Sequence, residues 1–112
     1  MICIDPHPVA KNWVHWLLFD LPGSSRELAA EQSRTNRLDN GARQGLNSYG
    51  DTGWGGPQPP PGTGDHPYIF TLYALDIDPL PVKTELPSIE EVQNAMKGHI
   101  LGEATYTGFY SQ

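Results

Sequence analysis

The chain has 112 residues, which suits one domain over residues 1–112 and leaves no room for two. Hydrophobic residues make up 38% and charged residues 18%, a globular composition rather than a disordered one. The net charge is −6 and no cluster of lysine and arginine stands out, which argues against nucleic acid or an anionic membrane surface as the main partner. The 12 glycines and 11 prolines disfavour a helical bundle, so we expect an all-β fold.

The cysteine content and the N-terminal residues indicate the compartment. Cys3 is the only cysteine, so no intrachain disulfide can form, and we expect this residue to be a small buried side chain in a strand. The first residues lack the basic and apolar regions of a signal peptide. No apolar run approaches the roughly 20 residues of a membrane span. We therefore expect a cytoplasmic protein without a transmembrane segment.

The first half of the chain predicts two strands. Residues 1–4 have the pattern of a strand end, and a rigid loop with two prolines follows at residues 5–8. Residues 12–21 are aromatic and β-branched, and Pro22 and Gly23 end this second strand. Simple alternation places one set of side chains on each face of the strand. The two sets are Trp13, His15, Leu17 and Phe19, and opposite them Val14, Trp16 and Leu18. Both faces are apolar, so we expect a central strand that is covered on both sides.

The rest of the chain predicts a long loop, two further strands and one helix. Residues 26–32 could form one or two helical turns, and residues 44–66 form a long irregular segment rich in glycine and proline. Leu46, Tyr49 and Trp54 give that segment side chains to pack, so we expect an ordered loop. Residues 67–75 and 103–110 predict strands.

A short helix is expected near the C-terminal end of the chain. Ser88 and Glu91 fit a capping box, and apolar residues recur at helical spacing after them. Gly98 is the expected stop of this helix. His99, next to that glycine, is expected to interact with the helix dipole.

Two histidines and one aspartate are the candidates for binding chemistry. His15 lies within a strand, His66 lies where the long loop returns to a strand, and Asp5 precedes the proline loop. A nearby aspartate orients a histidine ring and raises its pKa, and we expect Asp5 to do so for His15. A cationic histidine beside loop N–H groups makes an anion site. The alternative is purely structural, with His15 a satisfied core residue and His66 the cap of a turn.

Other chemistries fit the sequence less well. The chain has no nucleophile elbow, no Walker loop and no dinucleotide fingerprint, and Pro57 prevents the glycines at 50–56 from opening a helix. Nothing marks Cys3 as an activated thiol. Asp5, His7, His15 and His66 are possible zinc ligands, but their spacing matches no standard zinc pattern. We expect neither a cofactor nor a catalytic residue, and a binding protein rather than an enzyme.

Three stretches in order resemble the phosphatidylethanolamine-binding protein family, also called the Raf-kinase-inhibitor-like family. Residues 5–8 and 13–22 are similar to the family's Asp-Pro-Asp-Ala-Pro loop and its Trp-x-His strand. Residues 44–62 and 66–76 resemble its second signature. Residues 98–104 and 108–110 are similar to the C-terminal end of bacterial and archaeal members. The resemblance extends over nearly the whole chain.

The resemblance implies a β-sandwich with a pocket at one end that binds phosphate, phosphoethanolamine-like headgroups or other small anions. By motif match, Asp5, His15 and His66 fall on the family's pocket residues, and the walls are Trp13, Gly56, Pro57 and Tyr68. His7 stands where the family usually has its second aspartate, which makes the pocket rim less acidic. Pro67 replaces the usual arginine of the second signature.

Two alternative functions and one structural expectation accompany the resemblance. A regulator could dock a protein partner through the pocket rim, as kinase or protease inhibitors do, and an orphan hydrolase could use His15 or a metal. Family members normally begin with several strands before the proline loop, whereas only residues 1–4 precede it here. We therefore expect exposed apolar surface around residues 13–19 and pairing of two copies into a homodimer.

Overall fold

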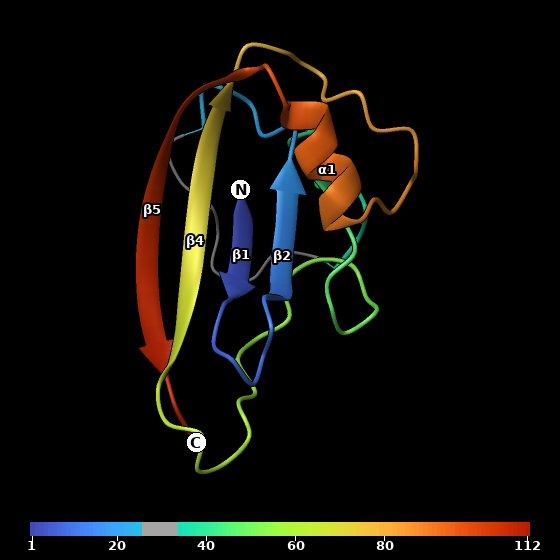
Figure 1. The fold of residues 1–112 in the computed structure, drawn as a ribbon. Helices are drawn as coiled ribbons and strands as arrows, with labels where there is room; N and C mark the ends of the chain where they lie inside the picture. The colour runs from blue at the N-terminus through green and yellow to red at the C-terminus, as the bar shows by residue number, and fades with distance from the viewer. Residues whose placement is uncertain (26–33) are drawn as a thin grey trace.

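The computed structural model describes residues 1–25 and 34–112, so the helical turns expected at 26–32 lie outside the described part. Its elements are β1 (Ile2–Asp5), β2 (Trp13–Phe19), β3 (Arg43–Gln44), β4 (His66–Leu75), α1 (Ile89–Met96) and β5 (Ile100–Tyr110). The strands form a five-stranded sheet in the order β3-β2-β1-β4-β5, and every neighbouring pair is antiparallel. Figure 1 shows β2, β1, β4 and β5 side by side. The predicted all-β class with one short C-terminal helix is confirmed. None of the described helices is long and apolar enough to cross a bilayer.

A β-bulge interrupts the pairing of β1 with β2 at His15. Cys3 pairs with Trp16 and Ile4 pairs with Val14, so His15 has no partner of its own on β1. An extra residue in one strand shifts the phase of its side chains. The predicted alternation along β2 is therefore wrong at its start, because Val14 joins Leu17 and Phe19 in one core cluster. The bulge leaves His15 beside Trp54, the same indole that Trp16 contacts, so these two consecutive side chains meet one ring.

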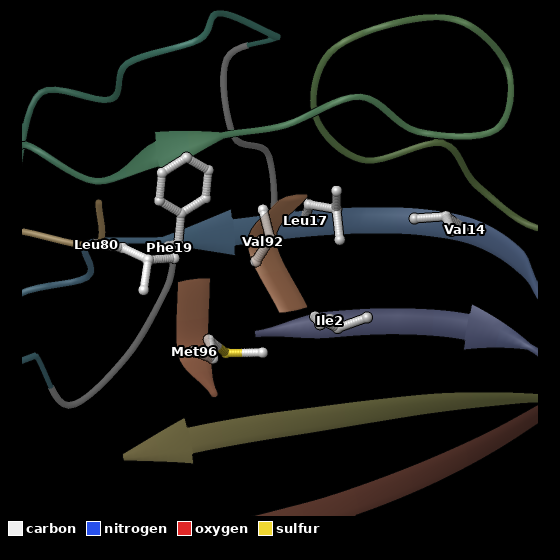
Figure 2. Close-up of a cluster of buried hydrophobic side chains, with 7 residues drawn as sticks. All are labelled: Ile2, Val14, Leu17, Phe19, Leu80, Val92 and Met96. Carbon is white, nitrogen blue, oxygen red and sulfur yellow. The ribbon is translucent and has the colours of Figure 1, made fainter. Parts of the chain in front are cut away.

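Helix α1 covers one face of the sheet. Val92 and Met96 on the helix pack with residues from β1, β2 and the segment before the helix (Figure 2). Those residues are Ile2, Val14, Leu17, Phe19 and Leu80. This cluster is the larger of the two apolar cores and holds the helix against the centre of the sheet.

The ends of α1 follow the prediction in part. Ser88 is the N-cap, and its hydroxyl accepts a hydrogen bond from the N–H of Glu91 at 3.3 Å. The Glu91 carboxylate instead accepts from the N–H groups of Lys83 and Thr84, so the capping box is only half formed. Gly98 ends the helix in the left-handed region at φ 79°. The His99 side chain pairs with Asp76 at 2.7 Å, not with the helix end, so its predicted dipole role is wrong.

The long loop covers the opposite face of the sheet. A second cluster contains Cys3, Trp16, Leu18, Ala42 and Tyr68, with Trp54 and Phe70 packed against it. The Trp16 indole donates to the side-chain oxygen of Gln44 at 2.7 Å. Because helix and loop each cover one face, β2 is buried on both sides, and this prediction is confirmed.

The exposed apolar surface lies on β5 and not on β2. From Val14 to Phe19 the second strand is buried, and only Trp13 at its start is exposed, so the predicted exposure around 13–19 is wrong for most of that strand. The reason is the double cover by α1 and the long loop. Six large apolar side chains are instead exposed on β5 and the neighbouring part of β4: Leu72, Ile100, Leu101, Tyr106, Phe109 and Tyr110. Among residues 1–25 and 34–112, β5 is an edge strand with no strand beside its outer side.

Candidate ligand-binding site

Two proline-rich loops meet at one end of the sheet and enclose a small cavity. The loop between β1 and β2 and the loop before β4 extend from the same end, which is the lower end in Figure 1. The cavity has a volume of about 260 Å³. Its lining comes from both loops and from three strands: Asp5, Val9, Ala10, Trp13, His15, Tyr49, Gln58, Pro59, Pro60, His66 and Tyr68.

Asp5 and His66 form a buried pair in the wall of this cavity. The Nδ1 atom of His66 lies 2.6 Å from Oδ2 of Asp5, and both side chains are at most 3% exposed. The other carboxylate oxygen accepts the backbone N–H of His7 at 2.9 Å. The prediction that Asp5 orients His15 is therefore wrong. β1 and β4 run antiparallel, so the end of β1 lies next to the start of β4, where His66 stands.

Both ring nitrogens of His66 have hydrogen-bond partners. The Thr63 hydroxyl donates to the carbonyl of Pro60 at 2.7 Å and lies 2.8 Å from Nε2 of His66. Asp5 on Nδ1 and Thr63 on Nε2 therefore hold the ring in one orientation. The ring of His7 stacks on His66 with centroids 3.8 Å apart, and its Nδ1 accepts the N–H of Val9.

His15 is held by the backbone of the long loop. Its Nδ1 lies 2.6 Å from the carbonyl oxygen of Gly55, and its ring contacts the rings of Tyr49, Trp54 and Tyr68 with centroids 5.0 to 5.9 Å apart. Burial lowers the pKa of His15 below its usual value of 6.5, although the Gly55 carbonyl and the charge of Asp5 act in the opposite direction. The expected rise in this pKa is wrong, because the loss of water outweighs the distant carboxylate.

Tyrosine and tryptophan rings form the walls. Burial raises the pKa of Tyr68 to about 12, so its hydroxyl keeps its proton and remains a donor. Trp13 packs edge-on against Tyr49, with ring centroids 5.3 Å apart. The Tyr49 hydroxyl donates to the carbonyl of Gly56 at 2.7 Å. Gly56 and Pro57 lie next to this wall without lining the cavity, and Gly56 acts there as an acceptor.

Sequence reasoning missed the residues that the long loop and the first proline loop contribute to the lining. Tyr49, Gln58, Pro59 and Pro60 line the cavity, and Tyr49 was expected only to keep the loop ordered. That order is confirmed, because the loop bonds to the bulged strand through Ser48 N–H to Val14 and Gly55 N–H to His15. The sequence contained one indication of this contact, an aromatic residue placed among glycines. Glycines have no side chain, so they let a ring approach a strand closely.

A second hollow of about 640 Å³ lies elsewhere, between residues 46–50 and the start of α1. Of the described residues in its lining, Lys11 and Glu90 are charged and none is histidine or aspartate. Within residues 1–25 and 34–112, no three side chains of histidine, cysteine, aspartate or glutamate come together as metal ligands. The smaller cavity, where polar groups converge, is therefore the better candidate site.

The fold and the cavity define a sheet-rich protein with a small aromatic and histidine-lined pocket at one end of its sheet. The chain belongs to the phosphatidylethanolamine-binding protein family, because that family's model matches residues 1–111. It is 42% identical to a UPF0098 protein of Methanothermobacter thermautotrophicus and 34% identical to one of Aquifex aeolicus. Those alignments cover 98% and 100% of this chain, and 70% and 64% of the respective relatives.

Solved structures agree with this assignment. The crystal structure of Escherichia coli YbcL, described as a new member of the mammalian PEBP family, superposes with a TM-score of 0.85 at 29% sequence identity. The match covers 99% of this chain and 69% of the YbcL chain. The family resemblance that the sequence motifs predicted is therefore confirmed.

Proposed function

We propose that this chain binds small oxyanions, such as inorganic phosphate or a phosphoethanolamine-like headgroup, in the cavity at the end of the sheet. The observation that carries the proposal is the convergence of the Asp5–His66 pair, His15 and Tyr68 on one small cavity. Such a cavity, lined by apolar and aromatic side chains with a few convergent polar groups, is typical of a small-molecule site. The family's name supports the same class of ligand.

The geometry assigns a different task to each polar group. The Tyr68 hydroxyl is a donor, and both ring nitrogens of His66 stay bonded to Asp5 and Thr63 in the cavity wall. His15 presents its ring to the same space. A volume of about 260 Å³ accommodates a headgroup and excludes larger ligands from full burial.

Binding without turnover fits the arrangement of the possible nucleophiles. Asp5, His66 and Thr63 stand in the order of a hydrolase triad, but the Thr63 hydroxyl donates to Pro60, and Thr63 does not line the cavity. Cys3 is fully buried, and burial raises the pKa of its thiol to about 12, so it stays protonated. Neither side chain presents an activated nucleophile to a ligand in the cavity.

One observation favours a second candidate, a regulator that docks a protein partner through the pocket rim. Three large side chains at the mouth are exposed: Val9 by 50%, Trp13 by 36% and Tyr49 by 41%. Exposed aromatic residues beside a pocket are typical anchors of protein interfaces.

An NMR titration with phosphate and with phosphoethanolamine tests the proposed function. We expect saturable shifts at His15, His66 and Tyr68, and their loss in a His15→Ala variant. His99→Ala is the matched control, because His99 pairs with Asp76 at the surface and does not line the cavity. It should bind as the unmodified chain does. No saturable shift at millimolar ligand would contradict the proposal.

A further inference from the structure

The loop backbone fixes which nitrogen of His15 carries a proton. Nδ1 lies 2.6 Å from the carbonyl oxygen of Gly55, and a carbonyl can only accept, so Nδ1 is the donor. The bulge at His15 and the bond from the Gly55 N–H to the His15 carbonyl hold the two residues together from both sides. In the neutral ring the second nitrogen, Nε2, is then an acceptor and has no proton to give.

The surroundings of the ring keep it neutral. His15 is 3% exposed and meets Tyr49 and Trp54 of the long loop and Tyr68 of β4, all uncharged rings. The other histidine and the carboxylate on the same cavity are His66 of β4 and Asp5 of β1, and these two are bonded to each other at 2.6 Å. No lysine or arginine is among the described residues that line the cavity. Among those residues, none hydrogen-bonds to Nε2, so this nitrogen is available to a molecule in the cavity.

We propose, resting on the proposed function, that the cavity selects the proton-bearing monoanion of a phosphate monoester, whose P–OH group donates to Nε2 of His15. The Tyr68 hydroxyl donates to an unprotonated oxygen of the same phosphate group. The site therefore offers one hydrogen-bond acceptor, Nε2 of His15, and one donor, the Tyr68 hydroxyl. A phosphate group that has lost one of its two protons carries the matching donor and acceptor. In a fully deprotonated phosphate every oxygen is an acceptor, so Nε2 of His15 would face another acceptor. Two buried acceptors with no proton between them make the free energy of binding less favourable.

Three ligands of similar shape separate ligand protonation from protonation of the protein. Methyl phosphate has a second pKa of about 6, and methylphosphonate loses its second proton at higher pH. Methyl sulfate has the charge of the monoanion but no proton to donate. Isothermal titration calorimetry measures the three dissociation constants across the pH range in which the first two ligands ionise. Long-range ¹H–¹⁵N spectra of the complex report whether Nε2 of His15 carries a proton.

We expect the affinity for each phosphorus ligand to fall about tenfold for each pH unit above that ligand's own second pKa. The affinities of methyl phosphate and methylphosphonate should therefore begin to fall at different pH values. Methyl sulfate should bind about tenfold more weakly than the monoanion of either phosphorus ligand, which is the loss of one hydrogen bond. The spectra should show an unprotonated Nε2 in the complex.

The contrary outcomes distinguish the two proposals. Suppose that the affinities of both phosphorus ligands begin to fall at the same pH and that methyl sulfate follows the same curve. This result would show that His15 gains a proton and donates it. It would overturn the selection of the monoanion and leave anion binding intact. Binding of ethanolamine alone as tightly as methyl phosphate would show an ammonium site and overturn it too. No saturable binding of any phosphorus ligand would overturn the proposed function together with this inference.

Discussion

At the scale of single residues, the Asp5–His66 pair is the contact on which the pocket wall depends. Both partners are buried and bonded to each other at 2.6 Å, so a change in one disturbs a buried polar contact of the other. We expect Asp5→Asn to lower the free energy of unfolding by about 3 kcal/mol. Urea denaturation measures this loss. Asp65→Asn removes the same charge from an exposed position nearby and should change little; equal losses in the two variants would mean that the pair is not important for stability.

The lowered pKa of His15 makes the stability depend on pH in one direction. The unfolded chain binds this proton below about pH 6.5, whereas the folded chain binds it only at lower pH. The unfolded state therefore holds more protons in that interval, and the free energy of unfolding falls as the pH drops below 6.5. We expect urea midpoints to fall more for the unmodified chain than for His15→Gln between neutral and acidic pH. Parallel curves would contradict a buried, neutral His15.

The residue types of the pocket could be predicted from sequence, but their partners could not. Motif spacing brought Asp5, His15 and His66 to one site, and the structure places all three on one cavity. Which histidine receives the carboxylate depends on the neighbour of β1 in the sheet, and strand order is a tertiary property. Thr63 and Tyr49 were missed for the same reason, because their contacts depend on the path of a loop without periodic pattern.

At the scale of the elements, helix α1 owes its position to its cap and its apolar stripe. The Ser88 hydroxyl satisfies the N–H of Glu91, and Val92 and Met96 anchor the helix in the core. We expect Ser88→Ala to cost about 1 kcal/mol of stability in urea denaturation, because one helix N–H loses its partner. Ser88→Asp keeps an acceptor at the cap and should restore most of this loss. A Ser88→Asp variant as unstable as Ser88→Ala would contradict a capping role.

The bulge in β2 shows where pattern reasoning reaches its limit. Alternation correctly predicted a strand that is apolar on both faces, and correctly grouped Leu17 with Phe19. It assigned Val14 to the wrong face, because one extra residue at His15 changes the phase of everything before it. No residue at this point is typical of a bulge, and the reason for it lies in the pocket, where the loop carbonyl of Gly55 holds His15.

At the scale of the whole molecule, one edge of the sheet is unlike the rest. β5 is 11 residues long, its outer side has no strand partner in the described fold, and Glu103 is its only charged residue. Natural edge strands usually carry charges or bulges that oppose pairing with another chain. The exposed side chains of Tyr106 and Phe109, at 74% and 69%, lie along the same strand. A two-fold antiparallel pairing of β5 with β5 of a second copy would satisfy the free backbone groups of both chains.

We therefore predict that the protein self-associates through β5. Sedimentation velocity over a broad range of concentrations should show a sedimentation coefficient that rises with concentration. Tyr106→Lys places a charge on the edge and should shift the equilibrium toward the monomer, because two like charges would then face each other across the two-fold axis. Asn94→Lys adds the same charge on an exposed part of α1 and should leave association unchanged. A single monomeric species at all concentrations would contradict the prediction, and equal effects of the two lysines would place the contact elsewhere.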